Sequence, residues 1–367
     1  MTIEALELRR VVVPLVAPFR TATGAHTTVE KLLVRAMTTT GSGWGECPVG
    51  LGPGSLEAVE RLWAKWRRSA PTTAALPRPV AAAVETAALD ADLRGRNSSL
   101  AAFLGATRST VDAGVAVGLT GSLGELLDEV ALRLAQGYRR VKLKIEPGWD
   151  VEPVAAVRER FGDGVALHVD GNGTYRRADA EQLGELDRFG LLMLEQPLPP
   201  DDLTGHAELA RRIHTPVCLD EAIGSYADLE RALTLGACSI VNVKPARLGG
   251  LRAAVRVHDT CVERAVPVWC GGMLETGIGR AANLALAALP GFTLPADLSA
   301  SERYFETDLT EPFVLDDGRL AVPTGPGIGV DPLLDVVDAC TVERATVEPP
   351  PELRSPPGPR ARPQSPA

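Results

Sequence analysis

The chain has 367 residues, which is long enough to bury a large core and allows one to three domains. Its composition is that of a globular protein, with 45% hydrophobic and 23% charged residues. The net charge is −9 and basic residues form no long run, so we expect neither nucleic acid nor an anionic membrane as a partner.

The cysteines and the first residues indicate a reducing compartment. Glu4 and Glu7 interrupt the start of the chain, and no apolar stretch reaches the 18 residues of a membrane span. The six cysteines show neither a C-x-x-C pair nor the spacing of metal ligands. We therefore expect a soluble, cytoplasmic protein with free thiols.

The first hundred residues have the pattern of an antiparallel α+β unit. Apolar spacing predicts a strand over 3–16, a loop over 18–28 and a second strand over 29–38. The stretch "TTTGSGWGEC" predicts a turn into a third strand. Helices are predicted over 55–70 and 78–94 from apolar spacing and alanine content. We assign residues 1–111 to this N-terminal domain.

From residue 112 the pattern changes to short apolar runs that are each followed by a helical pattern. Alternation of this kind at about 25 residues predicts a parallel sheet with helical crossovers, and eight such units make a (β/α)8 TIM-type barrel. We assign residues 112–300 to the barrel. The eight runs are "GVAVGL" (114–119), "VKLKI" (141–145), "VALHVD" (165–170), "LLMLEQ" (191–196), "PVCLDE" (216–221), "SIVNVK" (239–244), "PVWCGG" (267–272) and "FTLPAD" (292–297).

The C-terminal part contains a segment that returns to the first domain and a tail. "EPFVLDDGRLAVPTGPGIGVD" predicts a strand pair, and we expect residues 301–346 to complete the N-terminal domain. Residues 347–367 are Pro-rich and are predicted to be disordered. The Gly-rich pieces at 50–54 and 324–329 do not lie between a strand and a helix, so they are predicted to be turns rather than phosphate loops.

Three carboxylates close three consecutive apolar runs of the predicted barrel. Asp170 ends the third run, Glu195 the fourth, and Asp220 follows the apolar part of the fifth. The carboxyl ends of barrel strands meet at one face, so these side chains should converge. Three close negative charges need a counter-charge, and all-oxygen ligands suit a hard cation. We therefore predict one divalent ion, Mg²⁺ or Mn²⁺.

Lysine is rare in this chain, yet three of its five lysines lie at predicted strand ends. Lys142 and Lys144 are two residues apart on the second run and project to one face, and Lys244 ends the sixth run. The three carboxylates lie between these two positions. Lysine can lose its proton when cations or burial lower its pKa, whereas arginine effectively cannot. Lys142 and Arg247 are cationic neighbours of the kind that would lower the pKa of Lys144 and Lys244.

This arrangement predicts proton removal next to a carboxylate. The cation would stabilise the enediolate as a Lewis acid, while a lysine on one face takes the proton. A lysine on the other face would return a proton, which gives racemisation, or would stabilise the intermediate while a β-leaving group departs. The predicted partner is a small-molecule carboxylate.

Other polar residues near these strand ends allow a structural or a functional role. His168 is predicted to be a hydrogen-bonded core residue rather than a ligand. Asn172 is either a turn residue or a group that contacts water on the cation. Glu221 should face away from Asp220, although strand twist would bring it near the cation.

The same residues resemble the enolase superfamily, which uses Lys or His bases with Mg²⁺, and in particular its muconate-lactonising subgroup. Over about residues 1–346 the chain is similar to the o-succinylbenzoate synthase / N-succinylamino acid racemase family. The motifs that carry this resemblance are "VKLKIEPGWD", "EQPL", "TPVCLDEAI", "VNVKPARLGG", "VPVWCGGMLETGIGRAAN" and "DLSASERYFETDLTEPFVL".

The resemblance implies a capping domain over the barrel mouth and Mg²⁺ or Mn²⁺ on the three carboxylates. It implies that Lys144 and Lys244 are the acid/base pair and that Lys142 tunes Lys144. Gly272 and Met273 of "GGM" would lie against the substrate. The implied reactions are dehydration to o-succinylbenzoate in menaquinone biosynthesis, racemisation of N-succinyl or other N-acyl amino acids, or both. An arginine at the place of Arg247 often accompanies racemase activity in the family.

Three departures from the family pattern concern the substrate. "PVGLGPGS" follows "GWGEC" where an aromatic- and serine-containing loop is usual, so the cap is shortened. Ala116 stands in "GVAVG" where serine is common, and "DGNGTY" has glycine where alanine commonly follows the aspartate. None of these changes touches the carboxylates or the lysines, so the chemistry is better determined than the specificity.

Alternatives within and beyond this chemistry remain open. Dipeptide epimerase and muconate-type cycloisomerase would use the same lysines. A Schiff-base aldolase would use one strand-end lysine as a nucleophile, but three converging carboxylates speak against it. A non-catalytic binding barrel is disfavoured by the intact set of six residues. We also expect a homo-oligomer.

Overall fold

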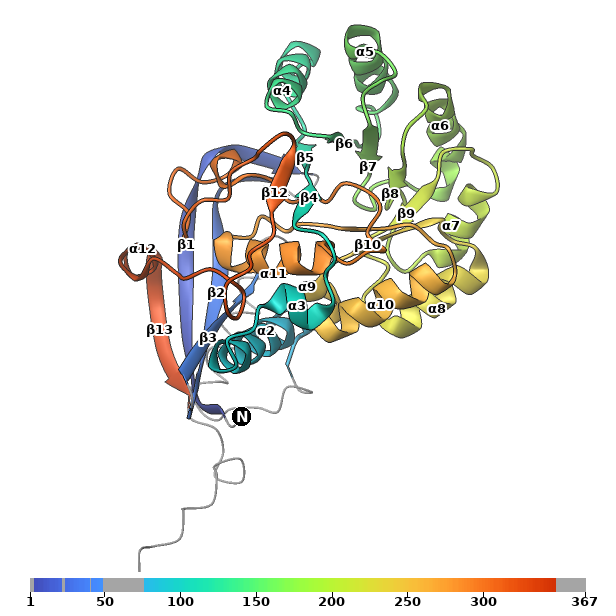
Figure 1. Ribbon diagram of the computed structural model, residues 1–367. Coiled ribbons are helices and arrows are strands. Elements are labelled where there is room, and N and C mark those ends of the chain that lie inside the picture. Colours follow the sequence, from blue (N-terminus) through green and yellow to red (C-terminus); the bar gives the residue numbers. More distant parts are fainter. Residues whose placement is uncertain (1–2, 22–23, 40, 49–75, 348–367) are drawn as a thin grey trace, which may run out of the picture.

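The computed structural model describes residues 3–21, 24–39, 41–48 and 76–347. In this part of the chain, an antiparallel sheet with helix α2 forms a cap that packs beside a barrel of parallel strands (Figure 1). The predicted helix over 55–70, the turn over 50–54 and the tail beyond Val347 lie outside the described residues. Among the helices that are described, none has the length and apolar character to cross a membrane.

The cap sheet has the strand order β13-β1-β2-β3, with every neighbouring pair antiparallel. The prediction of a loop over 18–28 is wrong, because β1 and β2 form one long hairpin. Their pairing is interrupted after Pro14 and resumes at Phe19 opposite His26. The strands are β1 (Ile3–Thr21), β2 (Gly24–Thr38), β3 (Gly41–Cys47) and β13 (Thr341–Val347).

Helix α2 (Arg78–Gly95) lies directly on β3, which confirms the helix predicted over 78–94. The glycines of "GSGWGEC" make this contact possible. A Cβ atom on Gly45 would lie 2.0 Å from the Ala83 carbonyl oxygen, and one on Gly43 would lie 2.2 Å from the Ala91 nitrogen. The Ala-rich face of α2 therefore approaches the strand backbone more closely than any larger residue would allow.

The C-terminal segment returns to the cap through a strand that the sequence analysis did not identify. β13 pairs with β1, and Val347 lies opposite Leu6. Val347 was expected to begin the tail, but its buried apolar side chain completes the edge of the sheet. Of the strand pair predicted over 311–331, β12 (Arg319–Ala321) forms and pairs with β4 (Thr110–Asp112), just before the barrel begins.

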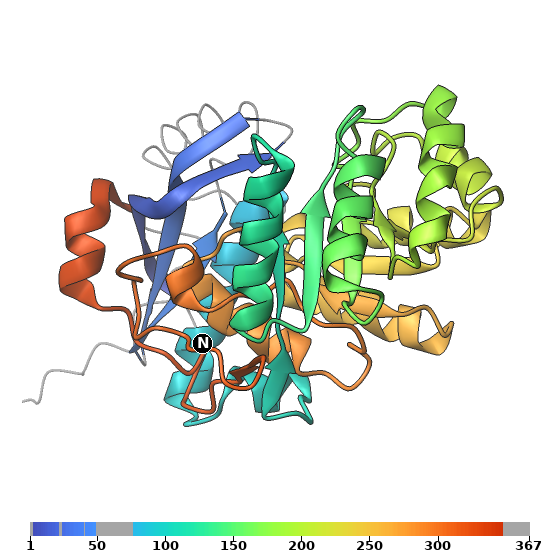
Figure 2. The same ribbon diagram turned by 90° about the horizontal axis from the view of Figure 1, so that it is seen from above.

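The barrel sheet contains seven parallel strands in the described part of the chain, and each strand pairs with the next one in sequence. Helices cover its outer surface (Figures 1 and 2). The strands are β5 (Gly114–Val117), β6 (Arg140–Lys144), β7 (Leu167–Asp170), β8 (Leu194–Glu195), β9 (Val217–Leu219), β10 (Ile240–Val243) and β11 (Val268–Cys270).

The helices of the barrel follow their strands along the chain. The α-helices are α4 (Leu123–Ala135), α5 (Val151–Phe161), α6 (Ala180–Gly184), α7 (Leu203–Ala210), α8 (Tyr226–Leu235), α9 (Pro245–Leu248), α10 (Leu251–Glu263) and α11 (Gly277–Ala287). Shorter elements and connections are α3 (Leu100–Leu104), α12 (Leu334–Cys340) and the 3₁₀ helices η2 (Arg177–Asp179), η3 (Glu185–Phe189) and η4 (Ser301–Arg303).

The eighth predicted run, 292–297, lies within the described residues but forms no regular strand, so this prediction is wrong in detail. Pro295 lacks a backbone N–H and interrupts the ladder. The segment still closes the barrel through isolated parallel bridges, from Phe292 to Val268 and from Ala296 to Ala113. A (β/α)8 barrel with an antiparallel cap is therefore the fold of this chain, as predicted.

Candidate active site

Three buried carboxylates lie side by side at the carboxyl ends of neighbouring strands. Asp170 is the last residue of β7, Glu195 is the last of β8, and Asp220 directly follows β9. Asp170 and Glu195 are opposite each other in the strand register. Each of the three is at most 1% exposed. Such burial is costly for negative charges unless positive charges lie nearby.

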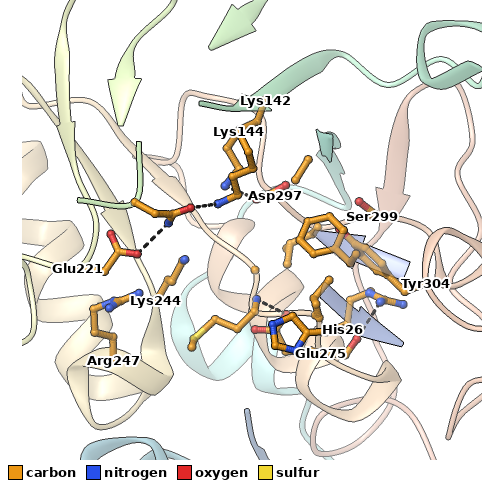
Figure 3. Close-up of a pocket in the computed structure, with 18 residues that line it drawn as sticks. His26, Lys142, Lys144, Glu221, Lys244, Arg247, Glu275, Asp297, Ser299 and Tyr304 are labelled. Carbon is orange, nitrogen blue, oxygen red and sulfur yellow. Dashed lines mark hydrogen bonds and ion pairs between the residues drawn. The ribbon is translucent and has the colours of Figure 1, made fainter. Parts of the chain in front are cut away.

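Lysine ammonium groups supply that positive charge in this structure. Lys144 Nζ lies 2.6 Å from Asp170 Oδ2, and Lys244 Nζ lies 2.8 Å from Asp220 Oδ2. Lys142 Nζ lies 3.4 Å from Glu195 Oε2 and 3.5 Å from Asp170 Oδ2. Figure 3 shows Lys142 and Lys144 on one side of the cavity and Lys244, beside Arg247, on another.

The lysine pKa values differ from the expectation that cationic neighbours lower them. Burial lowers the pKa of Lys142, but Asp297, Glu195 and Asp170 outweigh burial and raise its pKa well above the usual value. Burial likewise lowers the pKa of Lys244, and Asp220 reverses this so that its pKa is raised. The reason is that carboxylate oxygens lie 2.7–3.5 Å from Lys142 Nζ and 2.8 Å from Lys244 Nζ, and their charges outweigh both burial and the neighbouring cations.

The donor set formed by the three carboxylates suits a hard divalent cation. All six oxygens are carboxylate oxygens on adjacent strands, and oxygen ligands are what Mg²⁺ and Mn²⁺ prefer. Asp220 Oδ1 is buried and lies 3.1 Å from Arg247 Nη2, yet it has no hydrogen-bond partner among the described residues. As they stand, however, no three His, Cys, Asp or Glu side chains of the described ranges are grouped closely enough to hold a metal ion.

Asn172 connects the two sides of the site. Its Oδ1 accepts a hydrogen bond from Lys144 Nζ at 2.6 Å, and its Nδ2 donates to Glu221 Oε1 at 3.0 Å. Its backbone φ is +42°, a left-handed conformation that asparagine tolerates better than most residues. Burial and the charges of Asp220 and Asp170 raise the pKa of Glu221 to about 7. Asn172 is thus a turn residue, as one alternative expected, and it also holds Lys144, whereas its contact with water on the cation stays a prediction.

A cavity of about 300 Å³ lies above this arrangement. Its wall includes Lys142, Lys144 and Lys244 but none of the three carboxylates, which lie beneath the ammonium groups. The other predicted residues in the wall are Asn172, Glu221, Arg247, Gly272 and Met273. The structure thus brings the predicted lysines and substrate-side residues to one cavity, with the carboxylates at its base.

Sequence reasoning missed Asp297, which also lines the cavity. Its Oδ2 lies 2.7 Å from Lys142 Nζ, and its Oδ1 lies 3.7 Å from Arg140 Nη2. Although burial raises the pKa of Asp297, Lys142 and Arg140 outweigh burial and hold it far below the usual value. A signal for this residue existed, because Asp297 closes the eighth apolar run as Asp170 closes the third.

The cap also contributes to the wall, through residues that no sequence pattern marked. Phe19 and His26, which face each other across the β1–β2 hairpin, both line the cavity. Figure 3 shows His26 on the side of Glu275 and Tyr304, away from Lys144. The cavity is therefore built from both parts of the chain.

His168 lies beneath the carboxylates and is a buried, hydrogen-bonded residue, as predicted. Arg140 Nη1 lies 2.7 Å from His168 Nδ1, and His168 Nε2 lies 2.9 Å from Glu195 Oε2. Arginine only donates, so Nδ1 accepts and Nε2 carries the proton toward Glu195. Burial and the charges of Arg140 and Lys142 lower the pKa of His168 well below its usual value. The imidazole is accordingly neutral.

Comparison with known proteins agrees with this fold and site. The family model described as "Enolase C-terminal domain-like" matches residues 125–336, more than half of the chain. The chain is 52% identical over 366 residues to an N-succinylamino acid racemase of Amycolatopsis sp, covering 95% of this chain and 100% of that one. It is 43% identical over 367 residues to an o-succinylbenzoate synthase of Geobacillus kaustophilus, covering 94% and 96% of the two chains.

A solved structure shows the same architecture. The crystal structure of an enolase superfamily member from Listeria innocua has a TM-score of 0.87 and 36% identity, covering 95% of this chain and 99% of that one. A barrel with a cap and buried carboxylates and lysines at its mouth defines the class of protein. The chain belongs to the enolase superfamily of enzymes, in the family that contains the o-succinylbenzoate synthases and N-succinylamino acid racemases.

Proposed function

We propose that this enzyme removes the proton from the carbon next to a substrate carboxylate, with Lys144 and Lys244 as the acid/base pair. The supporting observation is that both ammonium groups line one cavity, one from the end of β6 and the other from the end of β10. Racemisation needs two such groups, because the proton leaves one face of the carbon and is returned on the other. Each lysine must be able to gain and lose a proton, which arginine effectively cannot do.

Asp170, Glu195 and Asp220 would hold one divalent cation, Mg²⁺ or Mn²⁺. A bound cation supplies Lewis-acid polarisation of the substrate carboxylate and stabilises the negative charge that develops when the proton leaves. Lys244 would then experience less of the Asp220 charge that now raises its pKa, and would release its proton more readily.

Lys142 and Asn172 would position Lys144. Lys142, held by Asp297 at 2.7 Å, would place a positive charge beside Lys144, since both ammonium groups lie near Asp170 Oδ2. Asn172 Oδ1 would orient the Lys144 ammonium group through a hydrogen bond of 2.6 Å. Glu221 holds the amide of Asn172, so its contribution is to keep that orientation.

The substrate class we propose is an N-succinyl amino acid for racemisation, with dehydration to o-succinylbenzoate as a second reaction of the same site. The names of the relatives that span the chain support both. Dehydration needs one base and one cation that stabilises the intermediate, so the same lysines suffice. Gly272 and Met273 would contact the substrate, and Arg247 favours racemisation. Dipeptide epimerisation and cycloisomerisation are alternatives for the same acid/base pair.

Proton NMR in D₂O tests the proposal. With Mg²⁺ or Mn²⁺, N-succinyl amino acids should lose their α-proton signal, and polarimetry on the same sample should show loss of optical rotation. Lys144→Ala and Lys244→Ala should each lower racemisation by about 10²- to 10⁴-fold, the usual contribution of a positioned acid or base. Arg212→Ala, at an exposed position on the barrel surface, is the control. Full racemisation by Lys144→Ala would refute the assignment.

Two further measurements separate the other classes of function. Borohydride in the presence of a carbonyl substrate would label a lysine in a Schiff-base aldolase, and we expect no label here. Calorimetry with Mn²⁺ should show one bound ion per chain, and a failure to bind any would favour a non-catalytic barrel. If N-succinyl amino acids do not exchange, the dehydration substrate is tested next.

Some properties around the site also remain proposals. We infer a cap of residues 1–111, a barrel of 112–300 and a returning segment of 301–346, which the pairing of β13 with β1 supports.

All six cysteines lie within the described ranges and are free thiols, which supports a reducing compartment such as the cytoplasm. A homo-oligomer is likewise a prediction, and light scattering would test it.

A further inference from the structure

Lys31 is a buried cation that the chemistry above does not use. It lies within β2 of the cap, and its side chain is 0% exposed. Within the described residues, no carboxylate lies at ion-pairing distance from Lys31 Nζ. The hydrogen bond that Lys31 Nζ donates among these residues goes to the Met273 carbonyl oxygen at 3.0 Å. A buried lysine that no carboxylate contacts directly is costly, although the charges of Glu46 and Glu275 offset part of that cost, whereas an apolar residue would fill the same place in the strand without it. Packing alone therefore does not account for a lysine here.

The segment that Lys31 holds is the loop after β11, which forms part of the cavity wall. Met273 N donates to Glu275 Oε2 at 2.8 Å, and Asn283 Nδ2 donates to Glu275 Oε1 at 2.9 Å. Leu274 has a φ of +56°, a left-handed conformation that costs a leucine free energy and persists only where neighbouring contacts enforce it. The contact from the cap is one of these contacts.

The same loop packs directly on Lys244. A Cβ atom on Gly271 would lie 2.5 Å from Lys244 Cε and 2.2 Å from Asn242 Oδ1. A Cβ atom on Gly272 would lie 2.3 Å from the Asp297 carbonyl oxygen. The loop backbone thus fills the space beside the Lys244 side chain, and a shift of the loop would change where Lys244 Nζ lies.

Lys144 has no such dependence on the loop. Its Nζ is fixed by Asp170 and Asn172, both on the segment that ends β7, at 2.6 Å each. Asn172 is held in turn by Glu221, which follows β9. The two proposed acid/base groups are therefore positioned by different parts of the structure. Lys144 is positioned by barrel residues, whereas Lys244 is positioned in part by the loop at 271–275, which Lys31 of the cap contacts.

We propose that Lys31 is a positioning residue that acts on the Lys244 face of the site and leaves the Lys144 face unaffected. Through the Met273 carbonyl it fixes the loop at 271–275 against Lys244, so that docking of the cap completes one half of the acid/base pair. This inference rests on the proposed function, because it assigns the two faces to the two lysines.

Face-resolved isotope exchange tests this. The D and L forms of one N-succinyl amino acid are incubated separately in D₂O with Mn²⁺, and initial loss of the α-proton is followed by NMR. Lys244→Ala identifies the enantiomer whose exchange depends on Lys244. In Lys31→Met, which keeps an unbranched side chain shorter by one atom and without the donor, that enantiomer should exchange at least about tenfold more slowly, since small misplacements of a reacting group have effects of this size. The other enantiomer should stay within about threefold.

Arg108→Met is the matched control. Arg108 is a half-buried cation that, like the fully buried Lys31, donates to a barrel carbonyl, that of Leu289 at 2.9 Å, but beyond the far end of α11. It should leave both enantiomers within about threefold of the unmodified protein, because it does not touch the loop at 271–275. Thermal unfolding of each variant verifies that the protein is folded. Should Lys31→Met not fold, Lys31→Arg takes its place, and its larger planar head should also displace the loop and slow the same enantiomer.

The outcomes separate the two proposals. Equal slowing of both enantiomers, or no slowing of either, overturns the role of Lys31 and leaves the proposed function standing. If the unmodified protein exchanges neither enantiomer, the proposed function falls and this inference falls with it.

Discussion

Buried charges are arranged differently at the barrel mouth and at the interface between cap and barrel. At the mouth, carboxylates and ammonium groups lie 2.6–2.8 Å apart, as in the pairs of Lys144, Lys244 and Lys142 with their aspartates. At the interface, Lys31 donates to a carbonyl, and the Glu46 carboxylate accepts hydrogen bonds from Thr276 N and Gly279 N at the start of α11. These mouth residues are held by ion pairs, whereas Lys31 and Glu46 at the interface are held by contacts with the backbone.

The difference shows in the pKa values of two buried acids. At the mouth, burial raises the pKa of Asp297 but Lys142 and Arg140 hold it far below the usual value. At the interface, burial raises the pKa of Glu46 to about 7, although Lys31 opposes this. Asp297 therefore stabilises the fold as an anion, whereas Glu46 remains costly to ionise. Both statements can be tested through the pH dependence of stability.

Asp297→Asn should have the largest effect on stability. It removes the nearest counter-charge of Lys142 and should cost about 3 kcal/mol at pH 7, the scale for breaking a buried ion pair. The pKa of Asp297 is lower in the folded state, so its contribution is present above the unfolded pKa of about 4 and is lost as the pH falls below it. Urea unfolding should therefore show a smaller loss on acidification from pH 6 to pH 3 in the variant than in the unmodified protein.

Asp163→Asn is the control for that experiment. Asp163 also lies near an arginine, with Oδ1 4.0 Å from Arg158 Nε, but its side chain is 98% exposed. Exposed pairs contribute little, so no measurable change is expected. If Asp297→Asn were as stable as Asp163→Asn at pH 7, the pairing of charges at the mouth would not support the fold.

Gly45→Ala should break the cap while leaving the barrel site able to bind a cation. Its new Cβ would lie 2.0 Å from the Ala83 carbonyl oxygen, a backbone atom that cannot rotate away. Overpacking of this kind should cost about 1–3 kcal/mol and lower the isotope-exchange rate, while calorimetric binding of Mn²⁺ is retained. Gly164→Ala, where a Cβ meets nothing within 4 Å, should change stability by no more than about 0.5 kcal/mol. Equal stability of the two variants would contradict the close approach of α2 to β3.

The mouth could be predicted from sequence because each of its residues has a place in a repeating pattern. Asp170, Glu195 and Lys144 end strands, and Asp220 and Lys244 directly follow strands whose apolar runs are visible in the sequence. Parallel strands in a barrel bring those ends together whatever the intervening helices contain. Asp297, which was missed, obeys the same rule.

The interface could not be predicted in that way. Lys31 lies in a strand whose alternation places it in the core, but nothing local indicates that its partner is the carbonyl of Met273, 242 residues further along the chain. The cavity contacts of Phe19 and His26 likewise depend on how the cap docks on the barrel. β13 was missed because its alternating pattern directly precedes the Pro-rich tail. Docking between two parts of a chain leaves no periodic signal.

Glu46→Gln should give the smallest effect and the one most specific to the interface. With a folded pKa of about 7, Glu46 retains a proton in the folded state between about pH 4 and pH 7 that the unfolded chain has lost. Stability from this group therefore falls as the pH rises through that window and is constant above it. Glutamine has no such dependence, so the stability of the variant relative to the unmodified protein should rise between pH 5 and pH 8.

The expected size is about 1 kcal/mol, less than a pKa shift of more than two units would give. Hydrogen bonds from Thr276 and Gly279 at the start of α11 favour the ionised carboxylate and offset part of the cost of burial. Urea unfolding at pH 5 and pH 8 measures the difference, and Glu152→Gln, at an exposed position in the first turn of α5, is the control. The stability of Glu46→Gln relative to the unmodified protein could instead fall between pH 5 and pH 8. The hydrogen bonds from the start of α11 would then outweigh the cost of burying the Glu46 carboxylate, and Glu46 would stabilise the fold as an anion, as Asp297 does at the barrel mouth.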